Sequence, residues 1–254
     1  IGEATTEATD DGYVIDCSRG TLAIKTAGGK GAIYGVAALL ERQLGVDYLA
    51  KDFYTLTPSA DVRIPQMHVE ESPAFRFRQT FSYSNNDSTY RDWMRLQEHR
   101  EMFAADMWVH TFDRLLPSSV YGKSHPEYYS FINGERRPGN HSQWCLTNPD
   151  IFEIVAHRID SIFKANPDQN MISVSQNDGN DTYCQCPECR KVNEYEGSPA
   201  GCYVRFLNRL AERFPDKQFS TLAYLFTMHP PKHVKPLPNV NIMLCDIDTK
   251  REVP

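Results

Sequence analysis

Asp178 combines a residue type and a position that suit acid–base chemistry. It follows residues 171–175, an apolar run that is predicted to form a buried β-strand. Burial at the end of a core strand raises the pKa of a carboxyl group, and a carboxyl that keeps its proton can protonate a leaving oxygen. The alternative role of Asp178 is an ordinary Asp-Gly turn with Gly179. The pattern therefore predicts Asp178 as a candidate general acid.

Glycoside cleavage needs a second carboxyl group that faces the first across the scissile bond. Asp246 and Asp248 follow residues 240–244, which are predicted to form a later strand of the same sheet. Either carboxyl can supply the base or the charge that stabilises the transition state. The alternative is that both aspartates cap the start of a helix.

Four further side chains at predicted strand ends suit the binding of sugar hydroxyls. An amide can hold a hydroxyl group at two points, and an aromatic ring can cover the apolar face of a sugar. Loop surfaces are polar by default, so the coincidence of several such residues at strand ends carries more weight than any one of them. The predicted substrate-binding residues are Asn85, His110, Trp144 and Asn177.

The seven cysteines are concentrated in one region, where Cys184, Cys186 and Cys189 lie within six residues. Three thiols at this spacing can converge on a structural zinc ion, with Cys202 or a histidine as the fourth ligand. A disulfide such as Cys184 to Cys189 is the alternative in a secreted protein, and free thiols are the third possibility. The role in each case is structural, and no cofactor is expected for catalysis.

The first 70 residues are predicted to form a small α+β domain. Short strands over residues 12–16 and 21–25 precede a glycine-rich turn and a helix whose apolar face ends at Leu44. Gly45 is the predicted left-handed cap of that helix. Extended stretches at residues 46–49 and 61–65 complete the domain, which is expected to end near Glu70.

Residues 71–254 alternate between predicted strands and helices, which indicates an α/β fold with a parallel sheet. An Asn133-Gly134 pair predicts a tight hairpin, and Asn148-Pro149 predicts a helix start. The predicted strands are 75–82, 107–111, 144–146, 171–175, 219–224 and 240–244, and the predicted helices are 90–105, 149–162 and 203–214.

This order favours a (β/α)₈ TIM-type barrel, of which residues 71–254 would form the first six βα units. Active sites of such barrels lie at the carboxyl ends of the strands. A complete barrel takes roughly 250 residues, so the sequence is expected to be a piece of a longer chain. An incomplete barrel exposes sheet edges, so we expect it to need the rest of its own barrel or self-association.

Composition narrows the class of protein further. The 254 residues are 41% hydrophobic and carry a formal net charge of −6, which is ordinary for a globular protein and argues against a nucleic-acid partner. No run of about 20 apolar residues is present, so no membrane span is expected.

Two families resemble this sequence. Residues 31–41 and 44–46 resemble the small α+β domain that precedes the barrel in family-20 hexosaminidases and α-glucuronidases. A second resemblance, to domain-of-unknown-function family 4838, rests on residues 173–179, Cys184, Cys186 and Cys189, and residues 221–224, 230–232 and 239–245. That family implies a Bacteroidetes protein encoded beside glycan-degrading genes and located in the periplasm or at the cell surface, with its signal peptide removed.

The resemblance also bears on catalysis. Family-20 enzymes place an Asp-Glu pair after strand four, where this sequence has Asn177-Asp178, which counts against their acetamido-assisted mechanism. The α-glucuronidases use an acid after strand four and carboxylates after strands six and seven, which Asp178 and Asp246 or Asp248 match in part. The predicted function is a glycoside hydrolase acting on an oligosaccharide or polysaccharide, and the alternative is a catalytically inactive glycan-binding protein.

Overall fold

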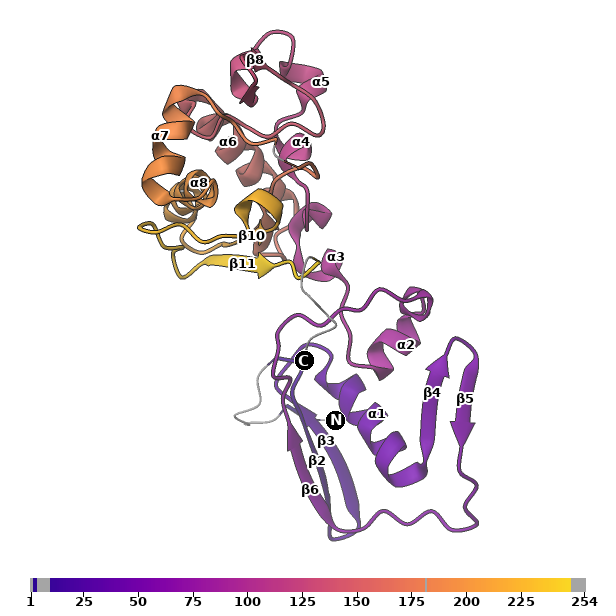
Figure 1. The fold of residues 1–254 in the computed structure, drawn as a ribbon. Coiled ribbons are helices and arrows are strands. Elements are labelled where there is room, and N and C mark those ends of the chain that lie inside the picture. Colours follow the sequence, from indigo (N-terminus) through magenta and orange to yellow (C-terminus); the bar gives the residue numbers. More distant parts are fainter. Residues whose placement is uncertain (1, 4–9, 181, 248–254) are drawn as a thin grey trace. The chain divides into compact units, whose positions relative to one another are not determined.

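The computed structural model describes residues 2–3, 10–180 and 182–247. It divides into two compact units, Ile1–Glu98 and His99–Pro254, and each is described separately (Figure 1). Helices and strands are mixed in both, so the predicted α/β class is confirmed. No helix in the described ranges has the length and apolar content that a bilayer span requires.

The first unit is built on a four-stranded sheet with the order β1-β3-β2-β6. The strands β2 (Tyr13–Ser18), β3 (Thr21–Thr26) and β6 (Met67–Glu71) are antiparallel neighbours, and the short β1 (Gly2–Glu3) runs parallel to β3. The helix α1 (Gly31–Leu44) packs on this sheet. A separate hairpin joins β4 (Val46–Ala50) to β5 (Phe53–Leu56). The buried apolar core of the first unit lies between the four-stranded sheet and α1, and consists of Tyr13, Ile15, Tyr34, Ala38 and Leu39.

Two glycines, Gly35 within α1 and Gly45 directly after it, explain where this helix ends and how closely it packs on the sheet. Gly45 adopts φ 61° directly after the last helical residue, which is the left-handed cap that the sequence predicts. Gly35 faces the strands so closely that a Cβ atom would lie 2.7 Å from Ile24 Cγ2. The absence of a side chain at Gly35 therefore sets the approach of helix to sheet.

The first unit extends to residue 98, well beyond the boundary that we predict near Glu70. The reason is electrostatic: Arg78 and Gln97 both donate to the buried carboxylate of Asp11, at 3.0 and 2.9 Å. Arg95 forms an ion pair with Glu41 of α1 at 2.7 Å. Such long-range polar pairs leave no periodic signature in a sequence.

The same region contradicts two predicted elements. Residues 75–82 form no strand. The predicted helix over residues 90–105 is instead α2 (Ser88–Trp93) and α3 (His99–Met102). The chain between them contains Arg95 at φ 57°, a left-handed conformation that ends a right-handed helix.

The second unit contains a parallel sheet with the order β11-β10-β9. The strands are β9 (Met171–Ser173), β10 (Gln218–Ala223) and β11 (Val240–Leu244), close to three of the predicted strands. Three long helices belong to the same unit: α6 (Pro149–Ala165), α7 (Pro187–Glu196) and α8 (Ala200–Arg213). Of these, α6 and α8 confirm the predicted helices over 149–162 and 203–214, whereas α7 is not predicted.

Local signals in the sequence account for several of these elements. Asn148 caps α6 by accepting a hydrogen bond from the Asp150 N–H at 2.9 Å, with Pro149 as the first helical residue. The predicted hairpin is confirmed as β7 (Phe131–Ile132) paired with β8 (Glu135–Arg136). Both turn residues between them have positive φ, as a type I′ turn requires.

The remaining described elements are short: η1 (Tyr83–Asn86), η2 (Ala104–Asp106), α4 (Phe112–Leu115), α5 (Ser118–Tyr121), η3 (Pro126–Tyr128) and η4 (Leu225–Thr227).

A complete barrel is not formed by the described residues. The predicted strands over 107–111 and 144–146 are absent as strands. The first of these segments nevertheless lies beside β9, because Met107 O accepts from Ser173 N at 2.8 Å and Thr111 N donates to Ser175 O at 3.1 Å. It is an irregular extension of the parallel sheet at the β9 side.

Asp11 should be the main polar anchor of the first unit. Replacing it by alanine leaves the Arg78 guanidinium without its carboxylate partner in a site where the Asp11 side chain is only 10% exposed. We expect Asp11→Ala to lower the free energy of unfolding by about 3–5 kcal/mol, measured by urea denaturation. Asp61→Ala removes a fully solvated ion pair with Arg63 and should cost less than about 1 kcal/mol. Equal effects of the two substitutions would contradict this assignment.

Candidate functional site

The carboxyl ends of β9, β10 and β11 meet at one edge of the sheet, as parallel strands in register require. The segment that follows β9 leads to Asp178, Tyr224 directly follows β10, and Asp246 follows β11. The Cys245 N–H donates to Ala223 O at 3.1 Å, so the pairing of the last two strands continues to this edge. These three positions define the carboxyl edge of the sheet.

The sequence predicts a buried carboxyl group at Asp178. The structure corrects this prediction, because Asp178 is exposed at this edge of the sheet. The Tyr224 hydroxyl donates to Asp178 Oδ1 at 3.3 Å. The Asp178 backbone carbonyl accepts from His141 Nδ1 at 2.9 Å. Neighbours on both sides thus hold Asp178 while its carboxylate remains accessible.

His110 lies at the same edge, next to Tyr224. Its Nδ1 contacts Gln176 O at 2.8 Å, and a carbonyl can only accept, so Nδ1 carries the proton. In the neutral imidazole, Nε2 is therefore the acceptor. The His110 and Tyr224 rings lie 6.0 Å apart between centroids. A phenol, an imidazole and a carboxylate accordingly form one connected group.

The side chain of Asn177 forms hydrogen bonds with backbone groups. Its Nδ2 donates to Ser142 O at 2.7 Å, and its Oδ1 accepts from the Asp113 N–H at 3.0 Å. The Gln143 side chain in turn accepts from Asn177 N and donates to Asn177 O, both at 2.9 Å. Asn177 is buried, and this exchange, the Gln143–Asn177 clamp, fixes the chain directly before Asp178.

Two other predicted sugar-binding residues have different surroundings. Trp144 is 1% exposed and stacks on Phe112 with ring centroids 3.7 Å apart, so it belongs to the core and not to a sugar-binding surface. Asn85 lies in the first unit, where its Oδ1 accepts from the Thr80 hydroxyl at 3.1 Å. Asp248 lies outside the described residues.

The structure therefore brings together Asp178 and His110 at an edge that also carries Asp246. The sequence does not predict three residues that contact residues 177 and 178 in the structure, namely Tyr224, Gln143 and His141. The only signal for Tyr224 is its place at the end of the predicted fifth strand. Gln143 and His141 lie in a loop, where their contacts with residues 177–178 are invisible to the sequence.

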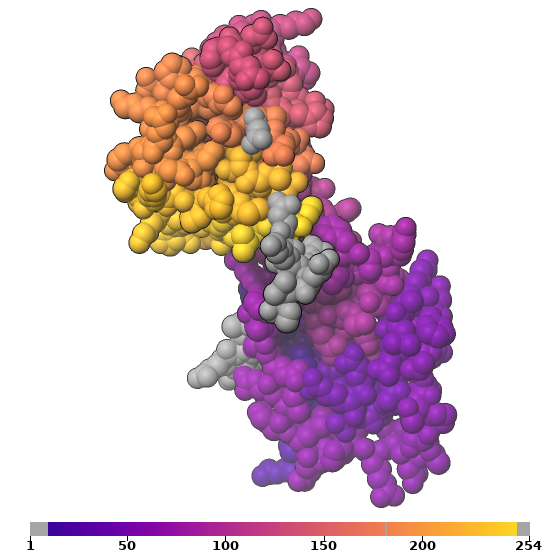
Figure 2. Space-filling model, viewed as in Figure 1, coloured from indigo at the N-terminus to yellow at the C-terminus, as the bar shows by residue number. Residues whose placement is uncertain are grey.

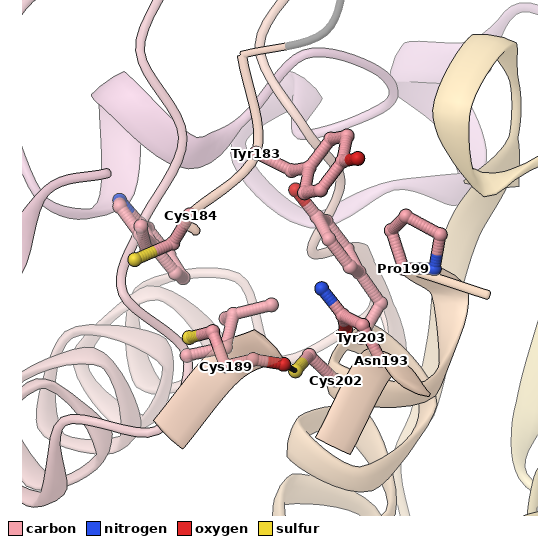
Figure 3. A pocket seen from close by; sticks show the side chains of 9 residues that line it. Tyr183, Cys184, Cys189, Asn193, Pro199, Cys202 and Tyr203 are labelled. Atoms are coloured by element: carbon pink, nitrogen blue, oxygen red, sulfur yellow. Dashed lines mark hydrogen bonds between the residues drawn. The ribbon is translucent and has the colours of Figure 1, made fainter. Parts of the chain in front are cut away.

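The second candidate site is a cluster of four buried cysteines. Cys145 joins the three predicted thiols of Cys184, Cys186 and Cys189, and the four sulfurs lie within 4.8 Å of one another. Cys202 is not the fourth member, because its Sγ contacts the Cys189 backbone carbonyl at 3.8 Å. Figure 3 shows Cys184, Cys189 and Cys202 around a small pocket. We call Cys145, Cys184, Cys186 and Cys189 the thiol cluster.

The close packing of the thiol cluster shifts the pKa values of its members in opposite directions. Hydrogen bonds from neighbouring thiols, chiefly Cys184 and Cys189, lower the pKa of Cys145. The same contact with Cys145 is the main cause of the raised pKa of Cys184 and of Cys189.

Fold and site define an α/β protein with polar side chains at the carboxyl edge of a parallel sheet. Residues 48–254 match the family described as "Domain of unknown function (DUF4838)", and the chain belongs to that family. The match confirms the resemblance to this family.

Comparison with curated proteins gives no match to this chain. Among solved structures, one described as "crystal structure of a beta-N-acetylhexosaminidase" is similar with 12% sequence identity and a TM-score of 0.42. The alignment covers 87% of this chain and 60% of that one, so this chain spans less than two thirds of that structure's length.

The hydrogen bonds of the Asn177 side chain predict a pH-dependent defect in Asn177→Asp. A carboxylate there would face Ser142 O, where the amide now donates, so the folded state favours the protonated acid and raises its pKa above the unfolded value of about 3.9. The variant should be closest to wild type below pH 4 and lose about 1–3 kcal/mol as pH rises to 7. Urea denaturation at several pH values measures this loss.

Asn170→Asp is the matched control, because Asn170 is exposed just before β9 begins. It should shift stability by no more than about 0.5 kcal/mol at either pH. A pH-independent loss in Asn177→Asp would show that the amide donor does not matter.

Proposed function

We propose that the chain binds a glycan at the carboxyl edge of its parallel sheet and hydrolyses a glycosidic bond there. The observation that carries the proposal is the accessible carboxylate of Asp178, held by the Tyr224 hydroxyl beside the His110 imidazole. A carboxylate can accept two sugar hydroxyls, and an aromatic side chain can cover the apolar face of the ring. These are the two kinds of contact that a sugar requires.

In the proposed reaction, the protonated form of Asp178 gives its proton to the glycosidic oxygen as the bond between this oxygen and the anomeric carbon breaks. A water molecule adds to the anomeric carbon and loses a proton to a carboxylate. Asp246, at the end of β11, acts as base or stabilises the positive charge that develops on the sugar. Tyr224 positions the Asp178 carboxyl through its hydroxyl group, and the His110 Nε2 accepts a sugar hydroxyl. Asp248 is the alternative second carboxylate.

The architecture that this function needs is a (β/α)₈ barrel, of which we propose that β9, β10 and β11 are three consecutive strands. Such barrels carry their active sites at the carboxyl ends of the strands. In keeping with the family resemblance, we place the protein in the bacterial periplasm or at the cell surface, where polysaccharides are accessible.

A glycan-binding protein without hydrolysis is the second candidate function. One observation favours it: the residue before Asp178 is an amide bound to backbone groups, so the described residues 174–180 present a single carboxylate, that of Asp178. A binding site needs no second carboxyl, whereas glycoside hydrolysis does.

Asp178→Asn tests the catalytic proposal. A general acid contributes about 10²–10⁴-fold to rate, so we expect the turnover of an oligosaccharide to fall by that factor while binding by calorimetry is retained. A substrate with a good leaving group needs little protonation and should lose less. The matched control is Asp168→Asn, an exposed aspartate before β9 begins, which should keep full activity.

Each alternative outcome has a definite meaning. Glycan binding by the wild-type protein without hydrolysis across a broad panel would select the binding function. Hydrolysis that survives intact in Asp178→Asn would reject Asp178 as the acid.

The free edge of β11 suggests a partner as well. Among the described strands β11 pairs only with β10, and it presents Ile242 and Leu244, the latter 72% exposed. Figure 2 shows the yellow C-terminal segment of the second unit at the surface. We propose that this edge pairs with a further barrel strand or, in the isolated chain, with a second copy.

Leu244→Lys should therefore reduce self-association, because a charged side chain on an edge strand opposes pairing between copies. Light scattering over a range of protein concentrations measures the effect. Val62→Lys, at a position of similar exposure outside any strand, is the control and should leave association unchanged. A wild-type chain that stays monomeric at every concentration would refute the proposal.

A further inference from the structure

The thiol cluster draws its four sulfurs from separate stretches of chain. Cys145 lies in the segment that leads to α6, Cys184 and Cys186 lie in the loop before α7, and Cys189 lies in the first turn of α7. All four residues are buried. Cys145 and Cys186 are 41 residues apart in sequence, yet their sulfurs lie 3.6 Å apart. The fold, and not local spacing alone, therefore assembles this group.

The distances match the edges of a metal–thiolate tetrahedron. With a Zn–S bond of about 2.3 Å, tetrahedral geometry places the sulfurs about 3.8 Å apart. Cys145 Sγ lies 3.6 Å from Cys186 Sγ and 3.9 Å from Cys189 Sγ. A disulfide bond would need about 2.05 Å. Two of the sulfur pairs thus lie at the spacing of ligands on one ion, and all four sulfurs lie within 4.8 Å of one another.

We propose that Cys145, Cys184, Cys186 and Cys189 bind one zinc ion in a closed site with four thiolate ligands. Four soft sulfur ligands select zinc or iron among the common metals, and zinc is the ion used where a site is structural and has no open position. This inference is independent of the proposed glycan function.

Groups around the cluster offset the negative charge of four thiolates on a divalent ion. The Phe131 N–H donates to Cys184 Sγ at 3.4 Å, and the Arg136 guanidinium approaches the same sulfur at 3.7 Å. Cys186 occupies the cap position of α7, where the helix dipole stabilises a thiolate. The Thr147 hydroxyl lies 3.1 Å from Cys189 Sγ. Such contacts orient metal ligands and tune their charge.

A zinc ion here would join three segments of the second unit. Its ligands Cys145 and Cys189 would link the segment before α6 to α7. Its ligand Cys184 would link both to the β7–β8 hairpin, through the hydrogen bonds of Phe131 and Arg136 to the Cys184 sulfur. The loop that begins at Asn177 ends at this cluster, so the metal would also limit the motion of Asp178. Its binding energy would then be part of the folding energy.

Metal analysis of the wild-type chain, purified under reducing conditions, tests the proposal directly. We expect elemental mass spectrometry of the purified protein to give about one zinc ion per chain. Protein produced with cobalt in place of zinc should show the absorption bands of tetrahedral Co²⁺ and the charge-transfer bands of thiolate ligands. A strong chelator should remove the metal and lower the melting temperature.

Cys145→Ser separates this site from one made by the three clustered cysteines alone. The variant should lose zinc down to near zero equivalents, whereas Cys202→Ser should keep it, because Cys202 is also buried but does not belong to the group of four sulfurs. If Cys145→Ser fails to fold, the metal content and cobalt spectrum of the wild type still decide the matter. Metal-free protein, bound iron in place of zinc, or a disulfide among these cysteines in a non-reduced digest would each overturn the proposal.

Discussion

The hydrogen-bonding demand of the backbone after β9 is the constraint on which the candidate site depends. The chain leaves the sheet there and loses strand partners, yet the groups of residues 175–177 stay buried, and a buried unpaired peptide group is costly. The Gln143–Asn177 clamp meets that demand with side-chain amides, and the Thr111 hydroxyl receives the Ser175 N–H at 3.0 Å. Asp178 emerges from a segment that is already fixed.

The thiol cluster acts on the other end of the same loop. β9 and the Gln143–Asn177 clamp hold the start of the loop, and Cys184 at its end is buried among the sulfurs of the cluster. Catalytic and binding groups need support of this kind, because small displacements of a reacting group reduce its efficiency strongly. A structural metal can therefore serve a sugar site without contacting the sugar.

Elements with strong local signals are predictable from this sequence, and those made by distant contacts are not. The apolar faces and caps of α1 and α6, the hairpin turn and the three parallel strands all follow from neighbouring residues. The boundary at residue 98 depends on Arg78 and Gln97 meeting Asp11, and no local pattern encodes that meeting. Three thiols of the cluster are visible in the sequence, whereas Cys145 becomes a member only through the fold.

The same distinction explains which predicted site residues belong to the site. Asn177 and Asp178 are adjacent polar residues at a strand end, and residue type alone makes both candidates for a sugar. Their surroundings differ in the structure. The Asn177 side chain is buried and forms hydrogen bonds with the backbone of Ser142 and Asp113, whereas Asp178 is exposed and accepts a hydrogen bond from Tyr224. A carboxylate at position 177 could not donate to Ser142 O, so the backbone contact itself favours the amide. The absence of an adjacent acidic pair is thus a consequence of how this loop is held.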